Sequence, residues 1–196
     1  MHAHKIIKKS FVFIFKILYH KGMMKHIFLL TVLTCFSCFG NLKAQEDVKS
    51  TAFTLYSSVR SLPAAVYYDL QNQEQTVPTT GGKVLLINFW KPNCRLCLME
   101  LPALDRLQND YKDKGVLVIA VSEETNIKAV QEALDTRRLK AITTGYDKDG
   151  KLLKAFGGQK VPRTLLINKE GKEVGFIQGL ADFDAPTLRQ QIDQLL

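Results

Sequence analysis

An almost continuous apolar run, VLLINFW at residues 84–90, is the feature that most constrains the fold of this chain. A run with so little polar alternation is typical of a strand covered on both faces of a sheet. A second such run, VLVIAVS, occupies residues 116–122. Between the two runs, leucines recur at three-residue spacing on one side of a predicted helix: Leu98, Leu101, Leu104 and Leu107. A strand, a helix and a second strand in this order favour an α/β fold.

The remaining segments continue this alternation. We expect a hairpin around residues 65–77, a helix over 126–139, a strand over 141–147, a short helix over 151–156, strands over 164–168 and 173–179, and a closing helix over 188–196. Together these segments predict one α/β domain over residues 61–196. Its central sheet is expected to be mixed but mainly parallel, with helices on both faces. Residues 46–60 are interpreted as an arm or an edge strand.

Residues 1–45 have the composition of a secretory leader. Lys25 and His26 precede a short apolar run, IFLLTVLTCFSCFG, and the small residue Ala44 follows it. This order is typical of a signal peptide, and the run is too short to span a membrane. We therefore expect an exported, periplasmic protein that starts at Met23 or Met24. Cys38 offers a less favoured alternative, namely a lipidated and membrane-associated protein.

Charge and histidine content divide at the same place. The formal net charge of +8 arises in the leader, which holds seven lysines and no acidic residue, and leaves 20 basic against 19 acidic residues beyond it. The body therefore lacks the basic excess of a nucleic-acid-binding protein. All four histidines and two of the four cysteines, Cys35 and Cys38, also lie in the leader. The predicted mature chain keeps two cysteines, Cys94 and Cys97, and no histidine.

The spacing of Cys94 and Cys97 permits three interpretations. A structural zinc site needs four ligands, usually Cys and His, and the mature chain offers too few. A structural disulfide is permitted in an exported protein, but so short a loop contributes only about 1.9 kcal/mol of chain entropy, against about 3 for a 15-residue loop. The third interpretation is a redox pair, and it accounts for more of the surrounding sequence.

A cysteine at the start of a helix has a lowered thiol pKa because the helix N-terminus and nearby cations stabilise the thiolate. Asn93 is a suitable N-cap residue, which would place Cys94 in the first helical turn beside the cation of Arg95. Cys94 is then the expected attacking thiolate. Cys97, one turn further and more buried, is expected to resolve the mixed disulfide. Pro102 is expected to kink this helix.

The order of motifs resembles the thioredoxin superfamily, and in particular the exported TlpA-like/ResA-like thiol-disulfide oxidoreductases. The resemblance covers about residues 60–196. It rests on VLLINFW followed by C-x-x-C-x-x-E-x-P, then VLVIAVS, DKDGKLLKAFG and VPRTLLINKEGK. It implies a thioredoxin-like fold, catalysis by the cysteine pair with no cofactor or metal, exchange with disulfide-bearing exported proteins, and a membrane electron donor.

The resemblance also assigns roles to further residues. Pro162 matches a cis-proline that lies against the disulfide and, with Val161 before it, shapes the substrate groove. Trp90 matches a tryptophan that ends the central strand, although an ordinary core or surface aromatic is the alternative interpretation. Glu100 matches an acid that influences proton transfer at the cysteine pair, although an exposed helix glutamate would look the same in sequence.

Several positions depart from the family pattern. Asn88 stands where cytosolic thioredoxins keep a buried aspartate, which would shift proton handling toward Glu100. Arg163 follows the proline where a small residue is usual. These departures concern the substrate range and the redox potential. Two other functions stay open beside the oxidoreductase, namely a thiol peroxidase of the AhpC/TSA type and a non-catalytic thioredoxin-fold module that binds peptides.

Overall fold

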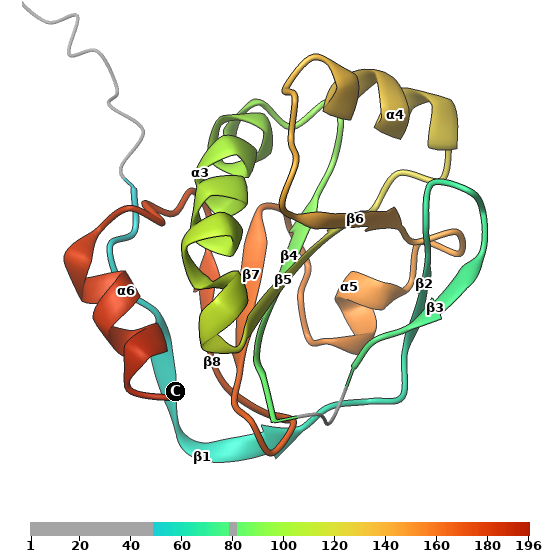
Figure 1. Ribbon diagram of the computed structural model, residues 1–196. Helices are drawn as coiled ribbons and strands as arrows, with labels where there is room; N and C mark the ends of the chain where they lie inside the picture. The colour runs from blue at the N-terminus through green and yellow to red at the C-terminus, as the bar shows by residue number, and fades with distance from the viewer. Residues whose placement is uncertain (1–48, 79–81) are drawn as a thin grey trace, which may run out of the picture. The chain divides into compact units, whose positions relative to one another are not determined.

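The computed structural model describes residues 49–78 and 82–196, which form an eight-stranded sheet with helices packed on it (Figure 1). The strands are β1 (Thr54–Ser61), β2 (Val66–Tyr68), β3 (Glu74–Thr76), β4 (Val84–Trp90), β5 (Val116–Ser122), β6 (Thr143–Tyr146), β7 (Arg163–Ile167) and β8 (Lys172–Gln178). The helices are α3 (Arg95–Tyr111), the 3₁₀ turn η1 (Lys112–Lys114), α4 (Ile127–Asp135), α5 (Leu152–Ala155) and α6 (Pro186–Asp193). The predicted α/β fold with a mixed sheet is confirmed.

The strand order is β1-β8-β7-β4-β5-β6-β2-β3. Among the described strands, β5 runs parallel to β4 and to β6, and every other pairing is antiparallel. The prediction of a mainly parallel sheet is therefore wrong. Two of the antiparallel pairs, β2–β3 and β7–β8, are hairpins, because a short turn can only reverse the chain. The other three, β1–β8, β4–β7 and β2–β6, join strands that are distant in sequence.

The central strand β4 is buried along its whole length because helices cover both faces of the sheet. Val84, Leu86 and Trp90 pack on one face, in the same apolar cluster as side chains of α3, α4 and α6. Leu85, Ile87 and Phe89 pack on the other face, with side chains of α5. The period-2 alternation of a strand thus places Asn88 on the same face as α3.

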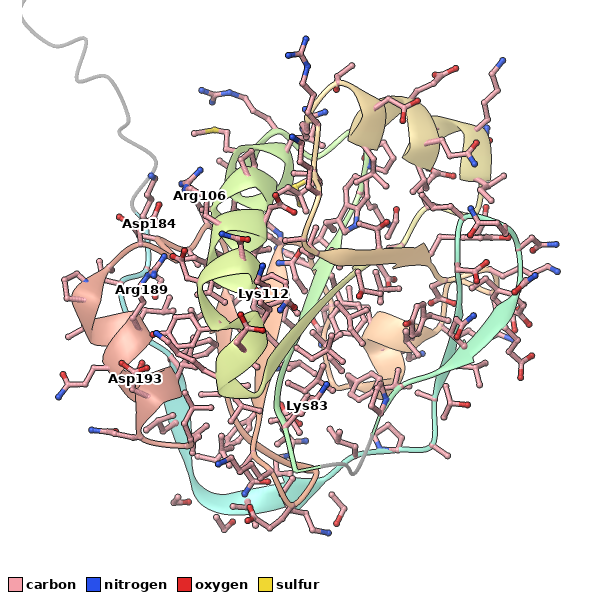
Figure 2. The ribbon with its side chains drawn as sticks, in the orientation of Figure 1. Lys83, Arg106, Lys112, Asp184, Arg189 and Asp193 are labelled. Carbon is pink, nitrogen blue, oxygen red and sulfur yellow. A yellow bond between two sulfur atoms is a disulfide. The ribbon has the colours of Figure 1, made fainter. Side chains whose placement is uncertain are left out.

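Helices α3 and α6 lie side by side on that first face and are joined by charged side chains (Figure 2). Arg106 of α3 bonds Asp184, just before α6, with 2.6 Å between Nη2 and Oδ2. Arg189 of α6 bonds Asp110 of α3 at 2.8 Å and Asp184 at 3.1 Å. These contacts hold α3, which begins at the cysteine pair, against the C-terminal part of the chain.

The outer segments differ in detail from the predictions. The hairpin expected around residues 65–77 is formed by β2 and β3. The helix expected over 126–139 begins as predicted at its N-cap Asn126 but ends at Asp135, because Arg138 adopts a positive φ of 52° that a right-handed helix cannot accommodate. Pro102 lies inside α3, which continues to Tyr111.

β1 lies at one edge of the sheet and pairs antiparallel with β8, in the region expected to be an arm or an edge strand. The leader, including Met23, Met24, Cys35 and Cys38, lies outside the described residues. Within residues 49–78 and 82–196, no helix is long and apolar enough to cross a membrane.

Candidate active site

Cys94 and Cys97 form a disulfide at the beginning of α3, with 2.10 Å between the sulfur atoms and 5.3 Å between the Cα atoms. The sequence-based assignment of Asn93 as N-cap is wrong, because Cys94 itself is the N-cap residue. Its backbone is extended, its Sγ accepts a hydrogen bond from the Cys97 N–H at 3.2 Å, and its carbonyl accepts the Leu98 N–H at 3.1 Å. A tight turn, in which the Cys94 N–H bonds the Lys91 carbonyl, delays the helix by one residue.

The two sulfur-bearing residues differ in exposure. Cys94 is partly exposed, whereas Cys97 is fully buried in the apolar cluster beneath α3. A thiol from another molecule can therefore reach Cys94 but not Cys97. This asymmetry is the one expected for an attacking and a resolving cysteine.

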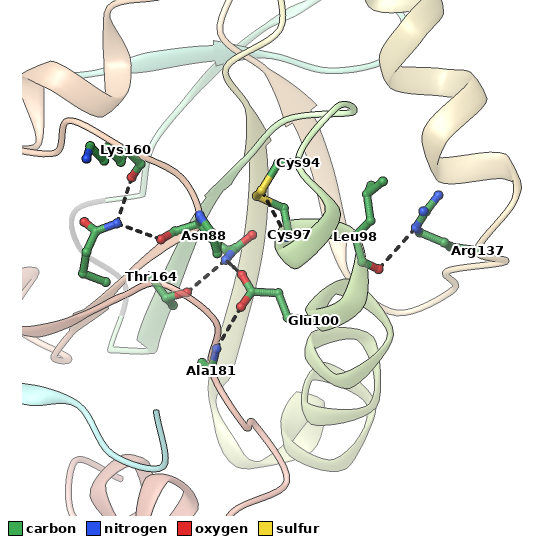
Figure 3. The surroundings of a disulfide bond; sticks show 11 residues. Asn88, Cys94, Cys97, Leu98, Glu100, Arg137, Lys160, Thr164 and Ala181 are labelled. Carbon is green, nitrogen blue, oxygen red and sulfur yellow. Dashed lines mark hydrogen bonds between the residues drawn. A yellow bond between two sulfur atoms is a disulfide. The ribbon is translucent and has the colours of Figure 1, made fainter. Parts of the chain in front are cut away.

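Glu100 lies one turn beyond Cys97 and is only 2% exposed. Its Oε1 accepts a hydrogen bond from Asn88 Nδ2 at 2.7 Å, and its Oε2 accepts one from the Ala181 N–H at 3.1 Å (Figure 3). Burial raises the pKa of Glu100 to about 7, although both hydrogen bonds favour the charged form. A carboxyl with this pKa can either hold or release a proton near neutral pH.

Asn88 connects this carboxyl to the neighbouring strand. Its Nδ2 also donates to Thr164 Oγ1 of β7 at 2.9 Å, and Asn88 and Thr164 are paired residues in the β4–β7 ladder. The amide is fully buried, and its Oδ1 has no hydrogen-bond partner among the described residues. In Figure 3 this oxygen lies on the side of the amide nearer the cysteine pair.

The Val161–Pro162 peptide bond is cis, as predicted. Because Phe89 pairs with Arg163 in the antiparallel β4–β7 ladder, Pro162 lies at the end of the sheet where β4 leads into the cysteine turn. Gln178 of β8 fixes this loop: its Nε2 donates to the carbonyls of Lys160, at 3.1 Å, and Pro162, at 3.0 Å. Pro162 is buried and Val161 is partly exposed.

Trp90 ends β4, as its sequence position suggested, and its side chain is completely buried in the same cluster as Cys97. Its Nε1 has no hydrogen-bond partner among the described residues. The indole therefore supports the cysteine turn from below and does not reach the surface of the free protein.

The fold and this site can be compared with known proteins. Over residues 58–191 the sequence matches the Redoxin family. The chain belongs to this family. It is 32% identical to the thiol-disulfide oxidoreductase ResA of Bacillus thuringiensis subsp. konkukian, over 66% of this chain and 80% of that protein. ResA of Halalkalibacterium halodurans is also 32% identical, over 62% of this chain and 74% of that protein.

Among solved structures, the Redoxin chain resembles a candidate thiol:disulfide interchange protein DsbE from Chlorobium tepidum. The TM-score is 0.65 over 72% of this chain and 99% of that one, and the sequence identity of 23% restricts this likeness to the fold. The expected resemblance to thioredoxin-superfamily proteins of the TlpA-like/ResA-like type is confirmed.

In this Redoxin-family protein the fold joins residues that are far apart in sequence. Glu100 contacts Asn88 of β4 and Ala181 of the loop between β8 and α6. Sequence reasoning missed Ala181 and Gln178, because a backbone N–H and an ordinary strand glutamine carry no local signal. Asn88 did carry one, as the single amide side chain in the apolar run of β4. No group of three or more His, Cys, Asp or Glu within the described ranges could hold a metal ion.

Proposed function

We propose that the protein is an exported thiol-disulfide oxidoreductase that exchanges disulfides with partner proteins through Cys94 and Cys97. The observation that carries the proposal is the disulfide between a partly exposed Cys94 at the N-cap of α3 and a fully buried Cys97. The names of the ResA relatives support the same activity.

Exchange begins with the reduced pair. The Cys94 thiolate attacks one sulfur of the partner's disulfide, a mixed disulfide forms, and the partner's other sulfur leaves as a thiolate. Cys97 then loses its proton and attacks the sulfur of Cys94, which releases the partner's second thiolate. Two electrons have passed to the partner, and Cys94 and Cys97 are again joined.

The start of α3 favours Cys94 as the nucleophile. The Cys97 N–H points at the Cys94 sulfur from 3.2 Å, and the helix N-terminus adds a partial positive charge. Both stabilise a thiolate and lower the pKa of the reduced thiol. The same groups stabilise Cys94 as the leaving thiolate when the pair accepts electrons, so the geometry serves either direction.

Glu100 is proposed to handle the proton of Cys97. Both side chains lie on the buried side of α3, three residues apart, and the sequence beyond position 45 contains no histidine. With a pKa of about 7, Glu100 can accept the proton when Cys97 attacks and return it when the pair is reduced.

Val161 and Pro162 are proposed to form one wall of the groove that receives the partner, with Trp90 supporting the cysteine turn beneath it. The leader pattern supports export to the periplasm, where the partners would be disulfide-bearing exported proteins. A reductase in an oxidising compartment also requires a membrane electron donor, and no cofactor beyond the cysteine pair enters this scheme.

A trapping experiment tests the proposal. In a Cys97→Ser variant the mixed disulfide on Cys94 cannot be resolved, so covalent complexes with exported proteins should accumulate. Dithiothreitol should reduce these complexes and release the trapped proteins. A Cys94→Ser variant, which keeps the buried thiol, should trap nothing. Peroxide turnover without trapped complexes would instead favour the thiol peroxidase, and the absence of both would favour the non-catalytic peptide-binding module.

A further inference from the structure

An open cavity of about 530 Å³ lies beside the cysteine turn and on the α5 side of the sheet. Its lining includes Lys91, Glu123, Leu153, Lys154, Gly158 and Gln159. Leu153 belongs to the apolar cluster on the face of the sheet opposite α3 and α4. The cavity is therefore separate from the buried surroundings of Glu100.

The cavity adjoins both segments that the proposed function uses. The backbone carbonyl of Lys91 accepts a hydrogen bond from the Cys94 N–H, so Lys91 belongs to the turn that presents the Cys94 sulfur. On the opposite side, Gly158 and Gln159 come directly before Lys160, Val161 and cis-Pro162. A polypeptide segment that places its disulfide at Cys94 can thus extend a neighbouring side chain into this space.

Close packing fixes the part of the cavity lining that Gly158 and Gln159 form. A Cβ at Gly158 would collide with Leu153 Cδ1 and would approach Arg163 Cδ to 2.9 Å, so the chain passes here only as glycine. The Gly158 N–H donates to the Leu153 carbonyl at 2.8 Å. This side of the cavity is therefore held in place by its contacts with α5.

The charges around the cavity favour an anionic occupant. Lys91 and Lys154 line it, and the buried Arg163 lies directly behind Gly158. The guanidinium of Arg163 stacks on Phe176 at 4.2 Å and bonds Gln178 at 3.2 Å, while its buried Nε has no hydrogen-bond partner within the described residues. The lining also holds one acid, Glu123, which accepts the Leu153 N–H at 3.1 Å, so its two lysines leave an excess of positive charge.

We infer that this cavity is a specificity subsite that receives an acidic side chain, Asp or Glu, next to the disulfide of the partner polypeptide. The inference rests on the proposed function and adds the chemistry of the partner segment to it. Lys91 and Lys154 supply the complementary charge, and Leu153 packs against the methylene groups of the bound side chain.

The test uses three synthetic disulfide-bonded peptides that differ only in the residue beside one cysteine, which is Glu, Gln or Lys. Dithiothreitol supplies the electrons, and the readout is the ratio of kcat/KM for the Glu peptide to that for the Lys peptide. Because the partly exposed Lys91 and the exposed Lys154 line the cavity, the native protein should prefer the Glu peptide by about threefold to tenfold, with the Gln peptide between them. Added salt should reduce the preference.

Lys154→Glu should bring this ratio to one or below, and Lys91→Glu should act in the same direction. The matched control is Lys128→Glu on α4, on the opposite face of the sheet, which should keep the native ratio. Because the readout is a ratio of two kcat/KM values for one variant, a general loss of activity or of folded protein cancels out. A native ratio near one, or a ratio unchanged by Lys154→Glu, overturns the subsite alone. A native protein that neither reduces the three peptides nor, in its oxidised form, oxidises their dithiol forms overturns the proposed function and the subsite together.

Discussion

Glu100 is a buried acid whose ionisation is linked to the stability of the fold. Burial raises its pKa from 4.5 to about 7, so the folded protein binds a proton more tightly than the unfolded chain does. The stabilisation from this proton is complete below pH 4.5 and is lost as the pH rises through 7. The same property on which the proposed role of Glu100 rests therefore costs stability above neutral pH.

Replacing Glu100 by Gln should remove this pH dependence. Between pH 4.5 and 7 the free energy of unfolding of the oxidised native protein should fall relative to that of Glu100→Gln by up to roughly 3 kcal/mol. Above that range the difference should stay constant. Urea unfolding at a series of pH values measures it. Glu170→Gln, in the exposed turn between β7 and β8, is the control and should follow the native profile. Parallel native and Glu100→Gln profiles would show that Glu100 does not titrate in this range.

Some features of the site could be predicted from the nearby sequence, and others depend on residues that are distant in the chain. Cys94 and Cys97 could be predicted from their spacing at the start of a helix, whereas Glu100 was assigned only by its match to the family pattern. The hydrogen bonds of Glu100 could not be predicted from the sequence, since Ala181 lies 81 positions away and is brought to Glu100 by the fold. Cys94, and not Asn93, is the N-cap because of one backbone turn, and residue preferences alone do not predict that turn.

Helix α3 is positioned by side chains along its length as well as by its apolar face. Asp105 Oδ1 accepts the N–H groups of Lys140, Ala141 and Ile142 at 3.0, 2.7 and 2.9 Å. These three residues lead into β6, so one carboxylate connects α3 to the segment before the next parallel strand. On the other side of the helix, the ion pairs of Arg106 and Asp110 connect it to the region of α6.

Asp105→Ala should lower the free energy of unfolding by about 1–3 kcal/mol, because it leaves partly buried N–H groups without their acceptor. Asp105→Asn keeps an acceptor oxygen at this position and should lower the free energy of unfolding by a smaller amount. Asp113→Ala, at an exposed acid in η1, is the control for loss of a negative charge. Thermal and urea unfolding measure all three variants. Equal stability of Asp105→Ala and Asp113→Ala would contradict the anchoring role.

Burial explains which elements the sequence predicts well. β4 and β5 are buried almost throughout, and their apolar runs matched the observed strands at both ends. The three-residue strands β2 and β3 have mixed exposure and were predicted only as an approximate hairpin. Strand direction was harder still, because an apolar run has the same composition whether its neighbour runs parallel or antiparallel.

We expect the fold to survive reduction of the cysteine pair. The disulfide closes a loop between residues only three positions apart and contributes only about 1.9 kcal/mol of chain entropy. By contrast, apolar clusters fill both faces of the sheet, and only one of them includes the cysteine pair. The pair lies beyond the end of β4, with Cys94 partly exposed and Cys97 buried in one of these clusters.

The reduction potential of the Cys94–Cys97 pair tests the proposed redox function most directly. The oxidised protein is equilibrated with mixtures of reduced and oxidised dithiothreitol or glutathione, and the fraction of disulfide is measured by thiol alkylation and mass. We expect a reversible two-electron transition with a midpoint between roughly −270 and −120 mV, the range of catalytic thioredoxin-fold proteins. A midpoint below about −300 mV, typical of structural disulfides, would show that the bond is a permanent staple and not a redox centre.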